Sequence, residues 1–419
     1  MSVRLSDAPW LVNASVRAVF EAIAVEGDAA RVVGGAVRNA LLGEPVGDID
    51  IATTAEPVTV AARARAAGLK AIPTGIDHGT ITVVSDGIPY EVTTLREDVE
   101  TFGRHAVVRF SRDWAADAAR RDFTMNALYV DPDGAIHDPT GVGHADCLAR
   151  RVRFIGDPGA RIAEDYLRIL RFFRFHAHYG SGAIDEAGLS AVIAARDGLR
   201  KLSAERIGHE MLKILPAPHA VETVEAMAET GIIEIVAGGV MRLEDFAHLD
   251  HLTEFAPEAR DAVLRLAALT CFVEEDVERL SDRLRLSNAQ QKRMADALAA
   301  SHGFSAVLDD LAVREKLYRL GHHTAIDAAL LAWCRDEAGP EDQGWRRLVI
   351  TLRNADMPAF PVAGRDLLAL GMKPGPQVGE QLRAIEAHWI SSGFTLSRTE
   401  LLDGIGVEPG SPRGSGAGG

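Results

Sequence analysis

The stretch RVVGGAVRNALLGEPVGDIDIATTAEP, Arg31–Pro57, decides the fold of the first part of the chain. It begins with an apolar β-branched run at Arg31–Val33, which predicts a strand, and a pair of glycines follows at once. Apolar spacing then predicts a helix over Ala36–Leu42 that ends at Gly43. A second strand is expected over Asp48–Ala52. This order of elements indicates a small sheet with helices packed on it.

Two aspartates, Asp48 and Asp50, lie two residues apart in the second expected strand. Residues i and i+2 of a strand project from one face and lie roughly 7 Å apart along it. Both carboxylates could therefore reach a pair of divalent cations about 4 Å apart, and Mg²⁺ is the natural occupant because it prefers oxygen ligands. The alternative is a pair of solvated aspartates on an edge strand, which would be the better interpretation of a D-x-D pattern standing alone.

The glycine pair Gly34 and Gly35 strengthens the metal interpretation. A glycine turn between a strand and a helix lets backbone N–H groups approach a phosphate, and the helix N-terminus adds a favourable dipole. Arg38, one turn into the helix, can meet the same phosphates with its fork of donors. For the glycine pair considered alone, the alternative is that the glycines allow close packing of the backbone. Together with the carboxylates, the pattern predicts a triphosphate held against two metals.

Other phosphate-binding motifs are absent from the sequence. The chain contains no G-x-x-x-x-G-K-[ST] motif and no G-x-G-x-x-G motif after an expected strand. Interpretations as a P-loop protein or a dinucleotide-binding protein are therefore weak.

The whole chain has 419 residues, of which 47% are hydrophobic and 25% charged, so roughly two to four packed modules are expected. Strand-like runs are concentrated before residue 150, and the sequence after Asp157 has helical spacing. We therefore expect an α+β fold, in which a small mixed-sheet head precedes an all-α body. The expected parts are a head over residues 1–150, a helical neck over 151–215, a helical body and tail over 216–403, and a disordered tail over 404–419.

Further elements of the head follow from local patterns. We expect a helix near Val58–Ala67, a strand near Leu69–Ile72, and a hairpin of Thr80–Ser85 with Ile88–Thr94 around the turn Asp86–Gly87. In the rest of the chain, helical segments are expected near residues 161–178, 203–214, 220–229, 257–272, 288–300 and 377–389.

Charge and composition exclude several classes of protein. A formal net charge of −15 disfavours a nonspecific nucleic-acid coat, although seven arginines stand against three acids between Arg150 and Arg174 and form a basic seam. The three cysteines are odd in number and far apart, so neither a disulfide framework nor a cysteine metal site is indicated. The chain has no apolar run of about eighteen residues and no secretion signal, so we expect a cytoplasmic protein that does not enter a membrane.

Four motifs resemble those of one known family. They are VGGAVRNALLG at 33–43, DID at 48–50, RRDFTMNAL at 120–128 and EDYLRILRFFRF at 164–175. In order and spacing they are similar to the bacterial class II tRNA nucleotidyltransferase/poly(A) polymerase family, over roughly the first 215 residues. The resemblance implies a polymerase-beta-like nucleotidyltransferase head. Asn39 stands where this family usually has Asp, and we expect a local change in hydrogen bonding there.

The resemblance also implies roles for residues outside the glycine turn. In the RRDF motif, Arg120 and Arg121 would meet phosphates and Asp122 would accept hydrogen bonds from ribose hydroxyls. Glu91 would add a third carboxylate near the attacking 3′-hydroxyl, with an ion pair to Arg96 as the equally weighted alternative. The connection over residues 97–119 would include a flexible loop that helps to switch nucleotide specificity. Arg104 and Arg109 are the residues to test in it, with ordinary surface charge as the alternative.

The EDYLRILRFFRF segment is expected to be one helix with an apolar stripe and a charged side. A solvated charged face with salt bridges is the ordinary interpretation of such a helix. The resemblance implies instead that Asp165 and Arg168 select C and then A by hydrogen bonds to the base, with Glu164 orienting Arg168. Arg171 and Arg174 would continue the site toward phosphate or RNA.

The function that the resemblance implies is addition of CCA to the 3′ acceptor end of tRNA from CTP and ATP, with Mg²⁺ bound at Asp48 and Asp50. The helical body would grip the tRNA. A poly(A) polymerase or a partial, A-adding or CC-adding relative would share these motifs and stays an alternative. A noncatalytic RNA-binding protein of the same fold is the less favoured alternative, because RNA binding alone needs no paired metal carboxylates.

Overall fold

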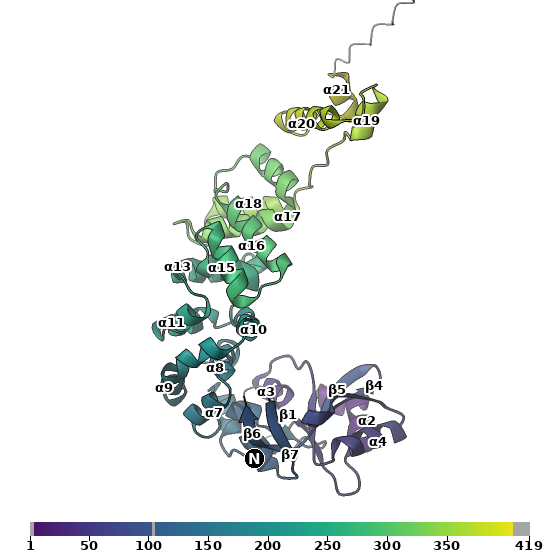
Figure 1. Ribbon diagram of the computed structural model, residues 1–419, viewed down its shortest axis with the longest axis vertical. Helices are drawn as coiled ribbons and strands as arrows, with labels where there is room; N and C mark the ends of the chain where they lie inside the picture. The colour runs from purple at the N-terminus through teal and green to yellow at the C-terminus, as the bar shows by residue number, and fades with distance from the viewer. Residues whose placement is uncertain (1–3, 103–104, 405–419) are drawn as a thin grey trace, which may run out of the picture. The chain divides into compact units, whose positions relative to one another are not determined.

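The computed structural model describes residues 4–102 and 105–404 as an α+β protein, with a mixed sheet in the first part and helices after it (Figure 1). The chain divides into two compact units. The first contains the residues up to Leu243 together with Glu275–Asn288, and the second contains Glu244–Glu274 and the residues from Ala289 onward. The expected fold class is confirmed, whereas the finer division into head, neck and body stays a prediction.

The head is built on a seven-stranded sheet with the order β3-β4-β5-β2-β1-β8-β9. Strands β2 and β5 run parallel, and the other neighbouring pairs in this sheet are antiparallel, which makes the sheet mixed as expected. The strands are β1 (Ala30–Val33), β2 (Asp50–Thr53), β3 (Lys70–Gly75), β4 (Thr80–Ser85), β5 (Ile88–Thr94), β8 (Tyr129–Val130) and β9 (Ile136–His137).

Helices pack on this sheet through apolar side chains. Helix α2 (Ala14–Ile23) contacts α4 (Pro57–Ala66), and both contact β4. Helix α3 (Gly35–Leu42) follows β1 and contacts α6 (Gly143–Leu148). The head also contains two short helices. Helix α1 (Pro9–Val12) precedes α2, and α5 (Trp114–Ala119) directly precedes the RRDF motif.

The predicted hairpin is confirmed. Asp86 and Gly87 both have positive φ, at 49° and 77°, which is the backbone conformation of a two-residue turn whose twist matches the strands on either side. Ser85 pairs with Ile88 directly beside this turn. The sequence located the turn because Asp-Gly tolerates positive φ at both positions.

The segment over residues 97–119, expected as a long connection, contains regular structure that the sequence did not predict. It contains a second hairpin, formed by β6 (Arg96–Phe102) and β7 (His105–Phe110), and then α5. The acids in the sequence of β6 have low strand propensity, so the local pattern did not indicate a strand. Arg104 lies outside the described residues. Arg109 is 69% exposed and pairs with Glu97 across the hairpin at 2.6 Å, which favours the surface-charge alternative for Arg109.

The second strand begins two residues later than predicted. Strand β2 starts at Asp50, so Asp48 lies in the loop that precedes it. The reason is the length of β1, whose last residue, Val33, pairs with Asp50. Gly34 then turns the chain into α3, which leaves Asp48 without a strand residue of β1 to pair with.

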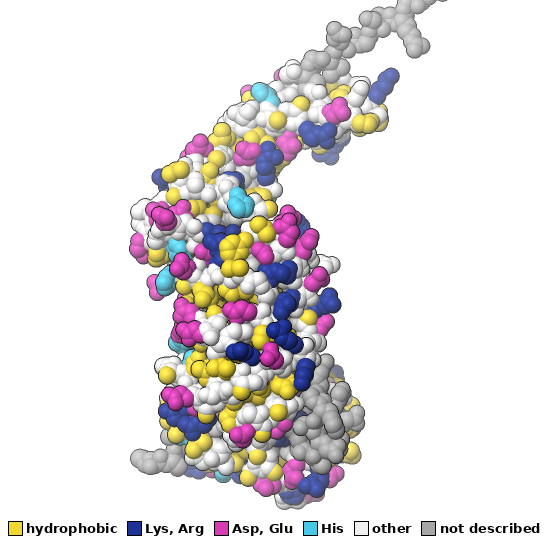
Figure 2. All heavy atoms as spheres, turned by 60° about the vertical axis from the view of Figure 1, so that its left-hand side comes forward, with side chains coloured by type: hydrophobic (Ala, Val, Ile, Leu, Met, Phe, Trp, Pro, Cys, Tyr) yellow, Lys and Arg dark blue, Asp and Glu magenta, His cyan; other side chains and the backbone are white. Residues whose placement is uncertain are grey.

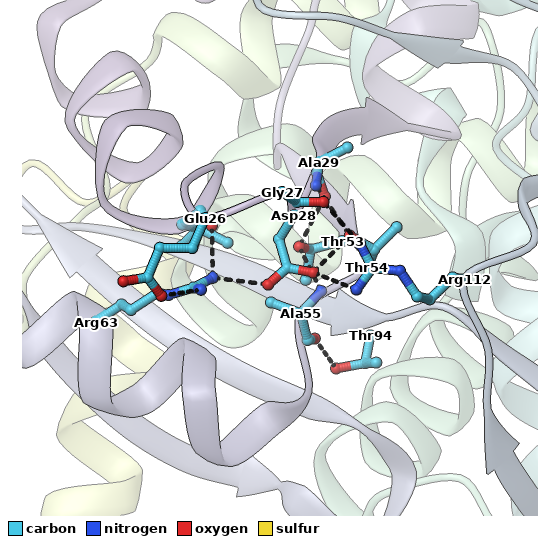
Figure 3. A network of polar contacts seen from close by, with 11 residues as sticks. Glu26, Gly27, Asp28, Ala29, Thr53, Thr54, Ala55, Arg63, Thr94 and Arg112 are labelled. Atoms are coloured by element: carbon cyan, nitrogen blue, oxygen red, sulfur yellow. Dashed lines mark hydrogen bonds and ion pairs between the residues drawn. The ribbon is translucent and has the colours of Figure 1, made fainter.

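The Asp28 side chain connects three parts of the head through hydrogen bonds (Figure 3). Its carboxylate accepts hydrogen bonds from Arg63 of α4 at 2.9 Å, from Arg112 after β7 at 2.6 Å and from Thr54 after β2 at 2.9 Å. Burial alone would raise the pKa of Asp28, but the bonds from Arg63, Arg112 and Thr54 outweigh it and hold the pKa below its usual value. The base of the second hairpin is therefore fixed to the sheet by a charged contact.

The helix expected over residues 161–178 is two helices. Helix α7 (Pro158–Glu164) ends where Asp165 takes an extended conformation, with φ −154° and ψ 107°, and α8 (Leu167–Tyr179) begins beyond it. The Asp165 side chain accepts a hydrogen bond from the Leu167 backbone at 3.1 Å. Asp readily makes such local bonds in place of helical ones, which explains the break.

An aromatic cluster joins the RRDF motif to α8. Phe123 lies 5.0 Å from both Phe154 and Phe175, measured between ring centroids, and Phe154 stacks on Phe172 at 5.3 Å. These contacts hold α8 against the head. The apolar stripe predicted for this helix is confirmed at four positions, Ile169, Leu170, Phe173 and Ala177, which are all buried.

Further helices of the first unit follow α8 in the chain, and two of them pack against it. Helix α10 packs along α8, and α11 also contacts it. The predicted helices over 203–214 and 220–229 match α10 and α11 closely. These helices are α9 (Glu186–Ala195), α10 (Ala204–Ile214), α11 (Ala220–Glu229), α12 (Ile232–Val236) and α15 (Glu274–Leu284).

The second unit is helical, and its core contains stacked tryptophans. Trp333 and Trp345 lie 6.0 Å apart with ring planes 7° from parallel. The helix expected over 257–272 is split into a short 3-10 turn at Pro257–Arg260 and α14. The helices are α13 (Leu243–His251), α14 (Ala262–Thr270), α16 (Asn288–Ser301), α17 (Asp310–Cys334), α18 (Gln343–Asn354), α19 (Gly364–Ala369), α20 (Pro376–Ser391) and α21 (Arg398–Asp403).

Lys and Arg side chains are interspersed with Asp and Glu side chains on the face shown in Figure 2. Among the described residues, no helix has both the length and the apolar character needed to span a membrane. The tail predicted over 404–419 lies, beyond Gly404, outside the described residues.

Candidate active site

A cavity of about 530 Å³ opens between the glycine turn of the head and the helices α8 and α10. It brings together nine of the residues predicted from the sequence, although they come from four separate segments of the chain. The cavity is lined by Gly34, Gly35, Arg38, Asp50, Arg121, Asp122, Asn126, Asp165, Leu167, Arg168, Arg171, Phe175 and Arg206. Four predicted residues, Asp48, Glu91, Arg120 and Arg174, are not among the lining residues.

Two further carboxylates lie near Asp50, which lines this cavity. Asp50 is the first residue of β2 and lies opposite Glu91 in the parallel pair of strands. Loss of solvent raises the pKa of Asp50, and the charges of Glu91 and Asp48 raise it further, while Arg121 opposes them. Asp50 is nevertheless exposed, as expected for a group at the mouth of a cavity. The carboxylates of Glu91 and Asp48 are therefore near enough to disfavour the negative charge of Asp50.

This cluster fits a hard divalent cation by its chemistry. Oxygen ligands and concentrated negative charge suit Mg²⁺, which usually takes one or two carboxylates and fills its other positions with water and phosphate oxygens. Within the described residues, no three His, Cys, Asp or Glu side chains form a ready-made metal site. These carboxylates therefore suit a cation that takes its remaining ligands from a bound triphosphate. Arg96, the alternative partner of Glu91, donates to the carbonyl oxygen of His78.

The glycine turn forms the wall beside the carboxylates. Gly34 has φ 75° and ψ −120°, a conformation that L-residues rarely adopt. A side chain there would meet Arg121 and the Asn126 carbonyl only at ordinary contact distance, so the backbone angle, rather than crowding, requires glycine. Gly35 begins α3, whose first N–H groups have no intrahelical acceptor and are available to an anion.

Arg38 is held rigidly at the base of the cavity. It is 7% exposed, and its guanidinium donates to the Asn126 side chain at 2.6 Å and to the Tyr179 hydroxyl at 2.8 Å. It also lies over the Tyr179 ring at 3.9 Å. Burial lowers the pKa of Arg38, with Tyr179 among the groups that oppose this effect. Arg38 therefore presents a fixed positive charge to the cavity.

Asn39 takes part in the same arrangement. Its side-chain oxygen accepts two hydrogen bonds from Arg38, at 3.1 and 2.9 Å, and its amide nitrogen donates to the Pro45 carbonyl at 2.8 Å. A carboxylate could not make the last of these bonds. Asn39 thus orients Arg38 without neutralising its charge.

The two arginines of the RRDF motif have different surroundings. Both pair with Asp117 of α5, Arg120 at 2.7 Å and Arg121 at 3.1 Å, and Asp117 also accepts from the Tyr129 hydroxyl. Burial would raise the pKa of Asp117, but Arg121, Arg120 and Tyr129 lower it overall. Arg121 lines the cavity and interacts with Asp50, whereas Arg120 does not line it. The structure therefore brings only Arg121 of this pair to the predicted phosphate site.

The Asp122 carboxylate is buried and accepts four hydrogen bonds. One oxygen accepts two hydrogen bonds from Arg171, and the other accepts from the Phe123 backbone at 2.8 Å and from the Asn126 side chain at 3.0 Å. A carboxylate has about four acceptor positions, and these bonds use all of them. The predicted contact to a ribose hydroxyl would have to replace one of these bonds. In this structure Asp122 orients Arg171 and Asn126.

The side chains of Asp165 and Arg168, the two residues predicted to read the base, bind different partners. Arg168 donates to Glu164 at 2.5 Å and to the Arg161 carbonyl at 2.6 Å, an arrangement that agrees with the orienting role predicted for Glu164. Asp165 instead accepts from Arg206 of α10 at 2.6 Å. Both side chains are partly exposed and line the cavity.

Arg174 lies outside the lining residues because it points to a different partner. It pairs with the buried Glu210 of α10 at 3.1 Å and so braces α8 against α10. The sequence reasoning missed Arg206 and Tyr179 as parts of the site and treated Asn126 as a loop residue. Arg206 lies in α10, which carries none of the four motifs, and Tyr179 lies at the end of α8 beyond the last motif residue, so only the packing of α8, α10 and the head could reveal them.

The sequence matches three known families along its length. Residues 30–153 match the "Poly A polymerase head domain", and residues 183–240 match the "Probable RNA and SrmB- binding site of polymerase A". Residues 258–403 match the tRNA nucleotidyltransferase domain 2.

Named relatives cover nearly the whole chain. The mitochondrial CCA tRNA nucleotidyltransferase 1 of Mus musculus is 33% identical over 419 residues, which covers 97% of this chain and 93% of the mouse protein. The CCA-adding enzyme of Levilactobacillus brevis is 31% identical over 93% of this chain and 96% of its own length. The crystal structure of the Bacillus stearothermophilus CCA-adding enzyme in complex with CTP has a TM-score of 0.70 and 28% identity, covering 90% of this chain and 92% of that chain. The chain therefore belongs to the class II tRNA nucleotidyltransferase/poly(A) polymerase family and is a nucleotidyltransferase.

Proposed function

We propose that this protein adds CCA to the 3′ acceptor end of tRNA from CTP and ATP, and that it selects each nucleotide with side chains rather than with a nucleic-acid template. The observation that carries the proposal is the single cavity of about 530 Å³, because the glycine turn, Asp50 and the pair Asp165 and Arg168 all line it. The relatives named CCA tRNA nucleotidyltransferase and CCA-adding enzyme support the same activity. The similar structure that contains CTP supports a cytidine nucleotide as substrate.

Membership of the family implies dependence on a divalent metal ion, and Mg²⁺ held by Asp48 and Asp50 is our specific proposal. When bound, such an ion supplies charge neutralisation for the triphosphate and lowers the pKa of a coordinated hydroxyl. Glu91, opposite Asp50, adds negative charge beside the position of the attacking 3′-hydroxyl. Arg121 and Arg38 would hold the phosphates, since both line the cavity and both are fixed by buried partners.

Base selection would depend on complementary donors and acceptors at the far end of the cavity. Cytosine and adenine both carry an amino group beside a ring nitrogen that accepts a hydrogen bond, whereas uracil and guanine carry a carbonyl and an N–H group there. A carboxylate at Asp165 accepts from the amino group, and the guanidinium of Arg168 donates to the ring nitrogen. The same pair can therefore accept C and A and reject U and G.

The test is to incubate the purified protein with tRNA that lacks its 3′ end, adding CTP, ATP or both, and to size the products. Three added residues with both nucleotides, and two with CTP alone, are expected. A ladder of adenylates would favour the poly(A) polymerase alternative, and growth by only one kind of residue would favour a partial enzyme. Failure to extend any RNA would contradict the proposal.

A further inference from the structure

Helix α10 brings to the cavity an arginine that belongs to none of the four motifs. Arg206 is partly buried, lines the 530 Å³ cavity and donates to Asp165 at 2.6 Å. It also lines a neighbouring cavity of about 360 Å³, together with Asp165 and Glu164. Arg206 therefore stands in the wall between two cavities, with its guanidinium directed at the carboxylate expected to read the base.

The position of Asp165 in the chain makes this contact important. Asp165 lies in the break between α7 and α8, so its backbone is not held by regular helical hydrogen bonds on both sides. One carboxylate oxygen accepts from the Leu167 backbone at 3.1 Å, and the other accepts from Arg206. Two anchors, one on each oxygen, fix the plane of the carboxylate. Each oxygen retains a second acceptor position for an incoming amino group.

The side chain of Arg168, the basic member of the proposed base-reading pair, makes its hydrogen bonds to other groups than Asp165. Its bonds go to Glu164 and to the Arg161 carbonyl. Arg206 thus holds the side chain of Asp165, and Glu164 holds the side chain of Arg168. The donor and the acceptor that face the base are oriented independently, each by a residue of opposite charge.

Helix α10 is itself fixed, so the anchor has a defined position. Glu210, four residues beyond Arg206 and therefore on the same side of the helix, pairs with Arg174 of α8 at 3.1 Å. On another side of α10, a side chain at Gly208 would lie only 2.1 Å from the Leu284 carbonyl at the end of α15, so the helix packs closely there. Arg206 reaches Asp165 from a helix that is braced at two further points.

We propose that Arg206 is a positioning residue that sets base specificity, by holding the Asp165 carboxylate in the orientation that accepts a hydrogen bond from the amino group of cytosine or adenine. The inference rests on the proposed function and extends it to a residue outside the motifs. Without the second anchor, the carboxylate can rotate about its side-chain bonds, and the bond to the amino group weakens. Uracil makes no such bond, so its incorporation should change less.

The experiment compares CTP and UTP as substrates for the wild-type protein and Arg206→Gln, with tRNA lacking its 3′ end as acceptor. The ratio of kcat/KM for CTP to that for UTP should fall by about tenfold or more in Arg206→Gln, since hydrogen bonds to charged groups contribute this much to discrimination. Arg206→Lys, which keeps the charge, should retain most of the ratio. Arg200→Gln is the matched control, because Arg200 is 62% exposed and pairs with Asp197 at the surface. It should leave the ratio unchanged.

A double variant separates positioning from a general loss of structure. If Arg206 acts through Asp165, Asp165→Asn and Asp165→Asn/Arg206→Gln should show the same low ratio. Equal losses for CTP and UTP in Arg206→Gln, with the ratio preserved, would overturn the inference, as would a loss in Arg206→Lys as large as that in Arg206→Gln. Wild-type protein that incorporates neither CMP nor AMP would instead contradict the proposed function, so the two failures are distinguishable.

Discussion

Asp50 and Glu91 lie opposite each other on the parallel strands β2 and β5, and Asp50 lines the cavity. Loss of solvent and the charge of Glu91 both raise the pKa of Asp50. The ionised form of Asp50 is thus disfavoured in the protein without ligands. A cation and a triphosphate bound together would remove this cost, which links binding of the nucleotide to binding of the metal.

Asp50→Asn should lower incorporation of CMP by about a thousandfold or more, because charge stabilisation by a metal is worth several kcal/mol of the barrier. Binding of tRNA, measured by gel shift, should change less than about twofold, because RNA affinity depends mainly on Lys and Arg contacts to phosphates and Asp50 is acidic. Asp86→Asn is the matched control, because Asp86 is exposed in the hairpin turn and Asn tolerates its positive φ. Retention of substantial activity by Asp50→Asn would exclude Asp50 as a metal ligand.

Removal of divalent metal with a chelator should abolish activity, and addition of Mg²⁺ should restore it. Glu91→Gln should raise the Mg²⁺ concentration needed for half-maximal activity, because the variant lowers the negative charge beside Asp50. The measurement is a Mg²⁺ titration of the initial rate at saturating CTP. An unchanged midpoint in Glu91→Gln would show that Glu91 does not contribute to cation binding.

Tyr179→Phe should weaken nucleotide binding without removing the catalytic groups. The variant keeps the ring that lies under Arg38 but loses the hydroxyl that accepts from it at 2.8 Å. The loss of this bond should cost about 1–2 kcal/mol, which corresponds to a rise in KM for CTP of roughly fivefold to thirtyfold. Initial rates over a range of CTP concentrations test this. A change in kcat with KM unaltered would contradict the role of Arg38 in ground-state phosphate binding.

Asp28→Asn should destabilise the head, because Asp28 accepts from Arg63, Arg112 and Thr54 (Figure 3). The free energy of unfolding should fall by about 1–3 kcal/mol at pH 7. Because the pKa of Asp28 is lowered in the folded state, its contribution is complete above the unfolded pKa of about 4 and is lost as the pH falls further. The gap between wild type and variant, measured by urea unfolding, should therefore shrink below about pH 4.

The control for this prediction is Glu26→Gln, which removes an exposed partner of Arg63. Glu26 is 80% exposed, so its loss should cost less than about 1 kcal/mol. If the difference in free energy of unfolding between wild type and Asp28→Asn stayed constant below about pH 4, the ionised carboxylate of Asp28 would not be the form that stabilises the head.

Local signals in the sequence predicted much of the fold and part of the site. Gly43 ended α3 and Asp86–Gly87 closed the hairpin because both positions require backbone conformations that few residues tolerate. The position of Asp48 was harder to predict, since it depends on the length of β1, which is a property of the neighbouring strand. The break at Asp165 was missed because the flanking sequence keeps helical spacing on both sides.

The missed residues of the site depend on packing between distant segments. Arg206 reaches Asp165 across 41 positions of sequence, and Tyr179 reaches Arg38 across 141. No local pattern distinguishes Arg206 from the exposed arginines near it. Arg120 and Arg174 show the converse, since each belongs to a recognised motif yet pairs with a buried acid away from the cavity lining.

The most direct measurement is a crystal structure of this protein with CTP and Mg²⁺ bound. The account predicts that the triphosphate lies along Gly35 and Arg121, that the ion joins its oxygens to the carboxylates of Asp48 and Asp50, and that the amino edge of cytosine meets Asp165. Nucleotide bound outside this cavity, or bound in it with the metal distant from both aspartates, would contradict the account.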